Sequence, residues 1–252
     1  MTRVDVNTFV GGYPFRHVPH PDPETLVKVL SREGTARAWV GHLPSAFWRD
    51  PAHGNAQLYA ALEPHRDVLR PAPCVRPDWP GWERGLREAR ERGAPAVRAY
   101  PPQWGFAPDD RRLVTLADAC AEAGMAVLLT VKFEDGRQRH PMDVAGDLTA
   151  AHVRSLVRGT RGRVVVTAAG RELIEETHWS LTEPERERLS WDISWIWGPP
   201  EDHLAKLFRT VGSARFVYGT MWPLRLTQTP AANLALLPDD VRGATLADPE
   251  PR

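Results

Sequence analysis

The sequence predicts a single α/β domain in which eight parallel strands close into a (β/α)8 barrel, and three observations support this fold class. The chain has 252 residues, which matches the roughly 250 residues of such a barrel. Short apolar runs alternate with amphipathic segments at about thirty-residue spacing, a pattern typical of a parallel sheet. No Gly-x-Gly-x-x-Gly turn or phosphate loop follows a strand, which disfavours the alternative of a doubly wound open sheet.

In the first half of the chain, alternating apolar residues predict a strand over 3–10 that ends at Gly11-Gly12. Asp22-Pro23-Glu24 provides a cap, a proline and an acidic first turn, and so begins a helix to about Arg32. The same criteria predict further strands at 36–41, 68–75 and 96–100, and helices at 55–62 and 82–92.

In the second half, a helix over 111–123 ends at Gly124. The continuous apolar run 125–131 indicates a strand buried on both faces. Strands are also expected at 163–168, 189–193 and 215–219, and helices at 144–157, from 171, at 203–211 and at 229–237. We expect the barrel to span 1–240 and the proline-rich end, 241–252, to be a flexible tail.

Composition excludes several classes of function. Lys plus Arg and Asp plus Glu both number 32, so no basic field favours nucleic acid or an anionic membrane surface. No apolar run approaches the roughly 18 residues that span a bilayer, and we expect a cytoplasmic protein. Cys74 and Cys120 lie in apolar surroundings, and we favour buried free thiols over a disulfide.

Several segments, taken in order, resemble the amidohydrolase-related (amidohydrolase 2) family of TIM barrels over nearly the whole chain. The resemblance begins with the first strand, Arg3 to Gly12, and continues with Asp50-Pro51-Ala52-His53-Gly54-Asn55, Pro80-Gly81-Trp82-Glu83, Val97-Arg98-Ala99-Tyr100-Pro101, Arg139-His140-Pro141, Ala169-Gly170-Arg171, Trp191-Asp192-Ile193-Ser194 and Val217-Tyr218-Gly219-Thr220.

The resemblance also implies where a metal would bind, because complete members have a His-x-His pair on the first strand, histidines on strands five and six, and an aspartate on strand eight. The matching positions here are Asn7, Phe9, Thr130, Ala168 and Met221. None has the imidazole or carboxylate that zinc prefers at such positions. We therefore expect the metal ligands to be lost, with no metal and no other cofactor bound.

Polar side chains nevertheless gather at the predicted strand ends, where barrels carry their active sites. As groups for proton transfer we expect His140, Lys132 and Asp192. As substrate-binding residues we expect Asp5, Asn7, Arg16, Arg98, Tyr100, Arg171, Trp195 and Trp222. The alternative for each is structural: buried arginines and carboxylates pair with one another, and a loop histidine is solvated.

Two functions follow from this pattern. The first is a small-molecule enzyme, a hydrolase or a decarboxylase-like lyase, in which Arg16, Arg98 and Arg171 hold a substrate carboxylate. The second is a non-catalytic barrel that acts as a binding subunit or structural partner of an active relative. As an assembly we expect a homodimer or a heteromer with a related barrel. Polar groups kept at the mouth favour the enzyme, because burying them costs free energy unless they are used or paired.

Overall fold

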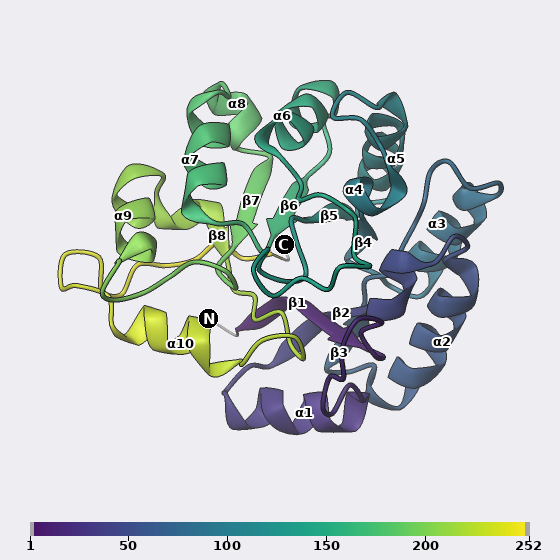
Figure 1. Cartoon of the computed structure of the whole chain (residues 1–252), viewed down its shortest axis with the longest axis horizontal. Helices are drawn as coiled ribbons and strands as arrows, with labels where there is room; N and C mark the ends of the chain where they lie inside the picture. The colour runs from purple at the N-terminus through teal and green to yellow at the C-terminus, as the bar shows by residue number, and fades with distance from the viewer. Residues whose placement is uncertain (1–2, 250–252) are drawn as a thin grey trace.

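Strands and helices alternate along the chain as the sequence predicts, and the strands form a central ring (Figure 1). The computed structural model describes residues 3–249. In this range the strands are β1 (Val4–Val10), β2 (Arg37–His42), β3 (Leu69–Pro71), β4 (Ala96–Ala99), β5 (Ala126–Thr130), β6 (Val164–Thr167), β7 (Leu189–Asp192) and β8 (Phe216–Val217).

Helices cover the outside of the ring on all sides (Figure 1). The longer ones are α1 (Pro23–Arg32), α2 (Ala52–Leu62), α3 (Trp82–Glu91), α5 (Arg111–Glu122), α6 (Ala150–Gly159), α7 (Arg171–Trp179), α9 (His203–Thr210) and α10 (Gln228–Ala235). Shorter helical segments are α4 (Pro101–Trp104), α8 (Glu183–Arg186), η1 (Leu43–Phe47), η2 (Glu63–His65) and η3 (Ser213–Arg215). Across 3–249, no helix has the length and apolar character needed to cross a lipid bilayer.

The ring closes at two seams between two parallel sheets, β1–β3 and β4–β8. At the first seam Cys74 bridges Arg98, and the Arg98 amide donates to the Pro73 carbonyl at 2.8 Å. At the second, Thr8 bridges Trp222, and the Val6 amide donates to the Tyr218 carbonyl at 3.0 Å. The predicted α/β barrel is therefore confirmed.

The barrel interior has an apolar layer near the strand starts and a polar layer near the strand ends. Inward positions two residues apart change from Leu128 to Thr130 on β5 and from Val165 to Thr167 on β6. The polar layer is almost completely buried and consists of Asn7, Arg98, Thr130, Thr167 and Asp192.

A bulge in β1 adds one residue to this interior. The register of β1 against β2 shifts between Asp5 and Thr8. As a result, Val6 packs in the inner apolar cluster while the next residue, Asn7, also faces inward and hydrogen-bonds Asp192 at the end of β7. Bulges of this kind re-aim side chains next to functional sites.

Two predicted elements have different bounds in the structure. The helix expected over 144–157 begins only at Ala150, because Thr149 caps it with His152 and the preceding Val144 is 89% exposed. Residues 131–149 therefore form one long loop after β5. The strand expected over 68–75 is reduced to β3, since Pro71 and Pro73 lack the amide hydrogen that a ladder needs.

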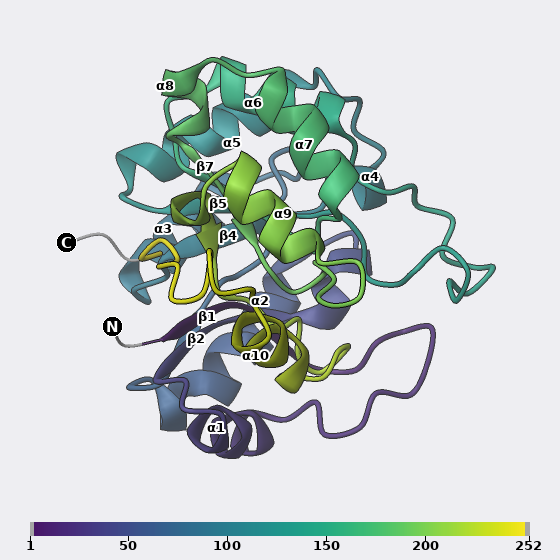
Figure 2. The ribbon, with the colours of Figure 1, turned by 90° about the vertical axis from the view of Figure 1, so that its left-hand side faces the viewer.

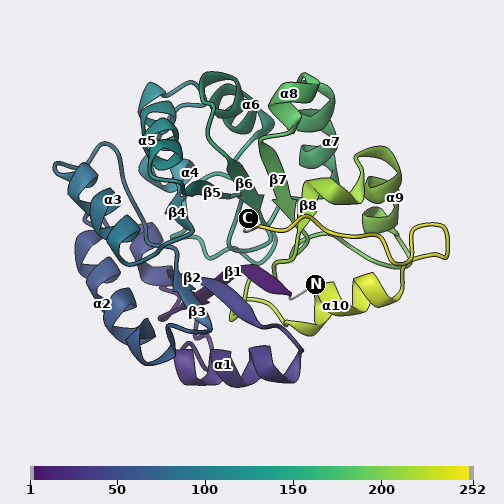
Figure 3. The same cartoon turned by 180° about the vertical axis from the view of Figure 1, so that it is seen from behind.

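The end of the chain returns to the strand starts, and Figure 3 shows this last segment in yellow. The Ala247 amide donates to the Phe216 carbonyl at 2.7 Å, and Ala247 packs against the inner apolar cluster. Within the expected tail 241–252, residues 241–249 thus lie against the barrel, and 250–252 lie outside the described residues. The flexibility of this tail stays a prediction.

Candidate functional site

A buried polar network crosses the barrel axis at the strand ends. The Asn7 side-chain amide donates to Asp192 Oδ2 at 2.8 Å, and Asn7 Oδ1 accepts from Arg98 Nη1 at 3.2 Å. The other oxygen of Asp192 accepts from the backbone amide of Ala168 at 2.8 Å. Burial raises the pKa of Asp192, while hydrogen bonds from Ser194, Ala168 and Asn7 lower it. β1, β4 and β7 are thus tied together by three side chains.

Arg98 is the cation of this network and is fully buried. Its Nη2 donates to the Thr8 carbonyl at 3.3 Å, and the Phe9 ring centre lies 4.1 Å from its guanidinium carbon. Gly41 on β2 leaves room for it, since a Cβ there would lie 2.6 Å from Arg98 Nε. Burial lowers the pKa of Arg98, and neighbouring Tyr100, Asp192 and Asp5 oppose that shift. Tyr100 is itself fully buried, which raises the pKa of its phenol.

Asp5 lies beside the network and is held by the segment after β8. Its Oδ2 accepts from the Thr220 hydroxyl at 2.6 Å, and its Oδ1 accepts from the amides of Thr220 and Asn7 at 3.1 and 3.0 Å. Burial raises the pKa of Asp5 to about 7, although these hydrogen bonds oppose the rise and Asp192 adds to it. Asp5 and Asp192 therefore share one buried environment with the guanidinium of Arg98.

The residues at this place do not fit a divalent metal. Phe9 covers Arg98, and the guanidinium already supplies positive charge where a second cation would be repelled. Of the positions that the resemblance assigns to ligands, Ala168 and Phe9 carry no donor atom in their side chains. Among residues 3–249 no three His, Cys, Asp or Glu side chains are grouped to hold a metal ion. Loss of the metal from the protein in solution stays a prediction.

Aromatic rings fill the mouth of the barrel above β1 to β5, and we call them the aromatic plug: Phe9, Tyr13, Phe15, Phe47, Tyr100 and Phe133. Phe133 is central, with ring centres of Phe47, Tyr100 and Phe9 at 5.2, 5.6 and 6.1 Å. Such tilted ring pairs stabilise the packing beyond the area they bury. The plug therefore covers Arg98 from the solvent side.

Two loops supply three rings of the plug, Tyr13, Phe15 and Phe133, and project to the same side of the molecule: the indigo loop 11–22 and the teal loop 131–149 (Figure 2). Arg16 in the first loop forms an ion pair with Glu134 in the second. His140 stacks on Phe15 with ring centres 5.7 Å apart. Its Nδ1 accepts from the Met142 amide at 3.1 Å, and its side chain is exposed. Arg16 also donates to the Leu224 carbonyl at 3.3 Å, and both Arg16 and His140 are exposed on the rim.

At the mouth, two cations lie against one indole ring, and we call them the cation pair: Lys132 and Arg225. Lys132 Nζ lies 5.0 Å and the Arg225 guanidinium carbon 4.3 Å from the ring centre of Trp195. Trp195 is buried, and both cations are half-buried. Sequence reasoning missed Arg225, although its place in the loop directly after the eighth strand could have indicated it.

Two further residues expected to bind substrate lie elsewhere. Arg171 donates from Nε to Glu175 Oε1 at 2.9 Å along its own helix, α7. Trp222 packs against a cluster of β1, β2 and their helices, and its indole nitrogen is buried without a hydrogen-bond partner. The structure thus brings Asp5, Asn7, Arg98 and Asp192 together, with Tyr100 against Arg98 and Lys132 beside Trp195.

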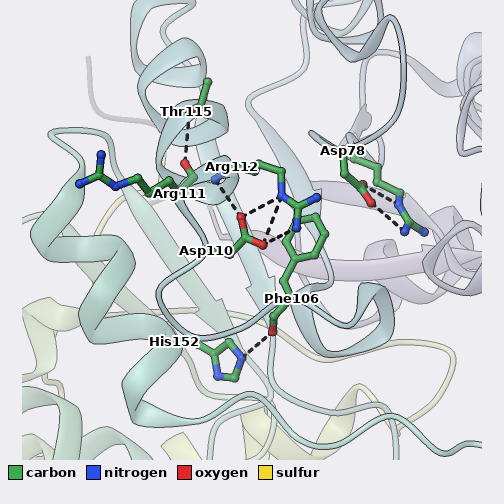
Figure 4. A network of polar contacts seen from close by, with 8 residues as sticks. Asp78, Phe106, Asp110, Arg111, Arg112, Thr115 and His152 are labelled. Atoms are coloured by element: carbon green, nitrogen blue, oxygen red, sulfur yellow. Dashed lines mark hydrogen bonds and ion pairs between the residues drawn. The ribbon is translucent and has the colours of Figure 1, made fainter.

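Beside the mouth, the loops after β3 and β4 hold charges that are paired locally (Figure 4). Arg112 Nε donates to Asp110 at 2.9 Å and its guanidinium lies 4.2 Å from the Phe106 ring centre. The Phe106 carbonyl contacts His152 Nε2 at 3.4 Å, and Asp78 pairs with Arg76 at 2.7 Å. This network fixes the loops and pairs Arg112 with Asp110 and Arg76 with Asp78.

Comparison with known proteins shows the fold. No protein-family model matches the chain, and no curated protein matches it either. Among solved structures, 2,6-dihydroxybenzoate decarboxylase from Rhizobium has a TM-score of 0.69 at 11% identity and covers 97% of this chain and 96% of its own. The chain has the fold of the amidohydrolase-like TIM barrels.

Other matches agree with this assignment. The 5-carboxyvanillate decarboxylase LigW from Sphingomonas paucimobilis has a TM-score of 0.61 at 12% identity, covering 86% of this chain and 78% of its own. A putative amidohydrolase from Staphylococcus aureus has a TM-score of 0.64 at 12% identity, covering 97% and 94%. At such identities the similarity is one of fold, and the named activities belong to those proteins.

Proposed function

We propose that the protein is a small-molecule enzyme, a lyase or hydrolase that acts on a carboxylate-bearing substrate without the metal centre usual in this fold. The observation that supports the proposal is the position of Lys132, a half-buried cation at the strand ends. Lys132 lies against Trp195, and Trp195 follows Asp192 in the loop after β7. Active sites of TIM barrels lie at this end of the strands. The decarboxylases among the structural neighbours support a decarboxylation, with hydrolysis as the alternative reaction.

Lys132 can carry the proton that a decarboxylation requires. Its ammonium group donates a proton to the carbon that bears the carboxylate, and the bond to the carboxyl carbon then breaks. The electron pair of that bond stays with the substrate, carbon dioxide leaves, and Lys132 regains a proton from water. Asp192 is fully buried and held by Ala168 and Asn7, so we assign it the role of positioning the polar network beneath the reacting group.

The test is a screen of small aromatic and aliphatic carboxylic acids, amides and lactones, followed by assays of Lys132→Ala, Asp192→Asn and His140→Ala. Removing a general acid costs about 10²–10⁴-fold in rate. We expect this loss in kcat for Lys132→Ala and a comparable loss for Asp192→Asn. His140→Ala serves as the rim control and should retain turnover; a folded Lys132→Ala variant with full turnover would refute the assignment.

The aromatic plug favours a second candidate function, a non-catalytic barrel that serves as the partner of an active relative. Phe9 covers Arg98, and beneath it Arg98 donates to Asn7, which donates to Asp192. This function predicts that no compound in the screen turns over and that the protein co-purifies with a metal-bearing barrel. The same screen therefore separates the two functions.

A further inference from the structure

We propose that Arg225 and Lys132, held against Trp195, form the seat for the carboxylate of the ligand, and that Arg225 is the residue that selects an anion there. This inference deepens the function proposed above and rests on it, because that function requires a carboxylate-bearing substrate. Loops after three strands supply the seat: Lys132 follows β5, Trp195 follows β7 and Arg225 follows β8. Since both cations contact the ring of Trp195, they lie in one small region of the mouth.

The cation pair lacks the partners that other cations at the mouth have. Arg16 pairs with Glu134, and Arg171 pairs with Glu175 at 2.9 Å. By contrast, in the part of the chain that the structure describes, neither Lys132 nor Arg225 forms an ion pair or a side-chain hydrogen bond, and Arg225 Nε is buried without any partner.

Burying a guanidinium without compensation is unfavourable. Burial lowers the pKa of Arg225, and the charges of Asp192 and Asp135 oppose this only from a distance. The indole face of Trp195 supplies a weak attraction to both cations. A bound carboxylate would supply what is missing, because a guanidinium presents paired N–H donors that match its two oxygens.

The same contacts argue against the arginines expected from the sequence as this seat. Arg98 is fully buried beneath Phe9, and its Nη atoms donate to Asn7 and to backbone carbonyls of β1. Its Nε has no partner, like that of Arg225, but Arg98 has no exposed part that a ligand could reach. Arg225 instead combines partial exposure with unused donors, which is what a ligand-binding arginine requires.

The test is calorimetric titration of the full-length protein with benzoate, with its neutral isostere benzamide, with acetate and with inorganic phosphate. We expect wild-type protein to bind benzoate more tightly than benzamide, and Arg225→Met to weaken benzoate binding by roughly tenfold or more. Lys132→Met should weaken it as well, and neither variant should change the binding of benzamide. Tryptophan fluorescence should change on benzoate binding in the wild type, and this change should be lost in Trp195→Phe.

Arg161→Met is the matched control, because Arg161 is an exposed arginine in the turn before β6 at the opposite end of the strands. It should bind benzoate as the wild type does. Equal affinity for benzoate in folded Arg225→Met and wild type, tighter binding of phosphate than of any carboxylate, or no carboxylate binding at all would each overturn the seat. Selective loss of benzoate binding in Arg225→Met without turnover of any compound would sink the enzymatic function and leave the seat standing.

Discussion

Asp5 receives three hydrogen bonds, yet burial still raises the pKa of this carboxyl from 3.8 to about 7. Burial also raises the pKa of Asp192, and both carboxyl groups interact with the guanidinium of Arg98. In the folded protein Asp5 therefore keeps its proton at pH values where the unfolded chain has released it. The stability of the protein should consequently depend on pH through this residue.

We predict that Asp5 makes the free energy of unfolding fall as the pH rises from about 4 to about 7. In that window the folded state binds one more proton than the unfolded chain, so the stabilisation is complete below about pH 4 and is lost by about pH 7. Three pH units correspond to a loss on the order of 4 kcal/mol. Urea unfolding at a series of pH values measures it.

Asp5→Asn removes the titrating proton but keeps an oxygen to accept from Thr220 and Asn7. The difference in unfolding free energy between this variant and the wild type should therefore grow in favour of the variant between pH 4 and 7. The exposed Asp67, replaced in Asp67→Asn, is the control and should follow the wild type. A difference that does not vary with pH would contradict the raised pKa of Asp5.

Two glycines leave room for the buried side chains of Arg98 and Asp192. On β2, a Cβ at Gly41 would lie 2.6 and 2.8 Å from Nε and Cδ of Arg98 and 3.2 Å from the Phe9 ring. After β8, a Cβ at Gly219 would lie 2.5 Å from Asp192 Oδ2. Neither neighbour can move far, because both are fully buried and hydrogen-bonded across the barrel.

Gly41→Ala should destabilise the protein by about 1–3 kcal/mol, the usual cost of overpacking a close-packed interior. Gly85→Ala is the matched control: Gly85 lies inside α3, a Cβ there meets nothing within 4 Å, and alanine should stabilise the helix by up to about 1 kcal/mol. Thermal and urea unfolding of both variants give the comparison. Equal stability of the two would show that Arg98 is not confined by β2.

The sequence predicts the strands and helices better than it predicts the contacts of the candidate site residues. The barrel follows from the spacing of apolar runs, and the cap at Asp22 is found where α1 begins. The contacts of Arg225, by contrast, depend on three loops that meet only in space. The pairing of Arg171 with Glu175 is local, but no pattern decides between a helix-surface pair and a ligand. The exposed position of His140 depends on the loop 131–149, where the sequence pattern favoured a helix from 144.

Taken as a whole, the barrel is covered at both ends. The aromatic plug lies over the strand ends, and Ala247 with its segment lies against the strand starts. Between them the polar layer contains its own positive charge, the guanidinium of Arg98. The stability of the molecule should therefore not depend on a dissociable ion.

We predict that chelation leaves the protein unchanged. Elemental analysis of protein prepared without chelators should give far less than one transition metal per chain, because the donor set around Asn7 and Asp192 does not suit one. The unfolding temperature should be the same with EDTA and with added zinc. One metal per chain, or a fall in unfolding temperature in EDTA, would contradict this.

The position of Arg98 on β4 has a consequence for how the molecule forms. An ion that balances buried carboxylates has to be captured from solution, so assembly depends on its supply and on competing ions. Here the balancing charge is the guanidinium of Arg98, which is part of the chain and is brought into the interior with β4. Folding of the barrel interior is then a unimolecular event that does not depend on the concentration of metal ions. The positive charge leaves the interior only when β4 separates from β1.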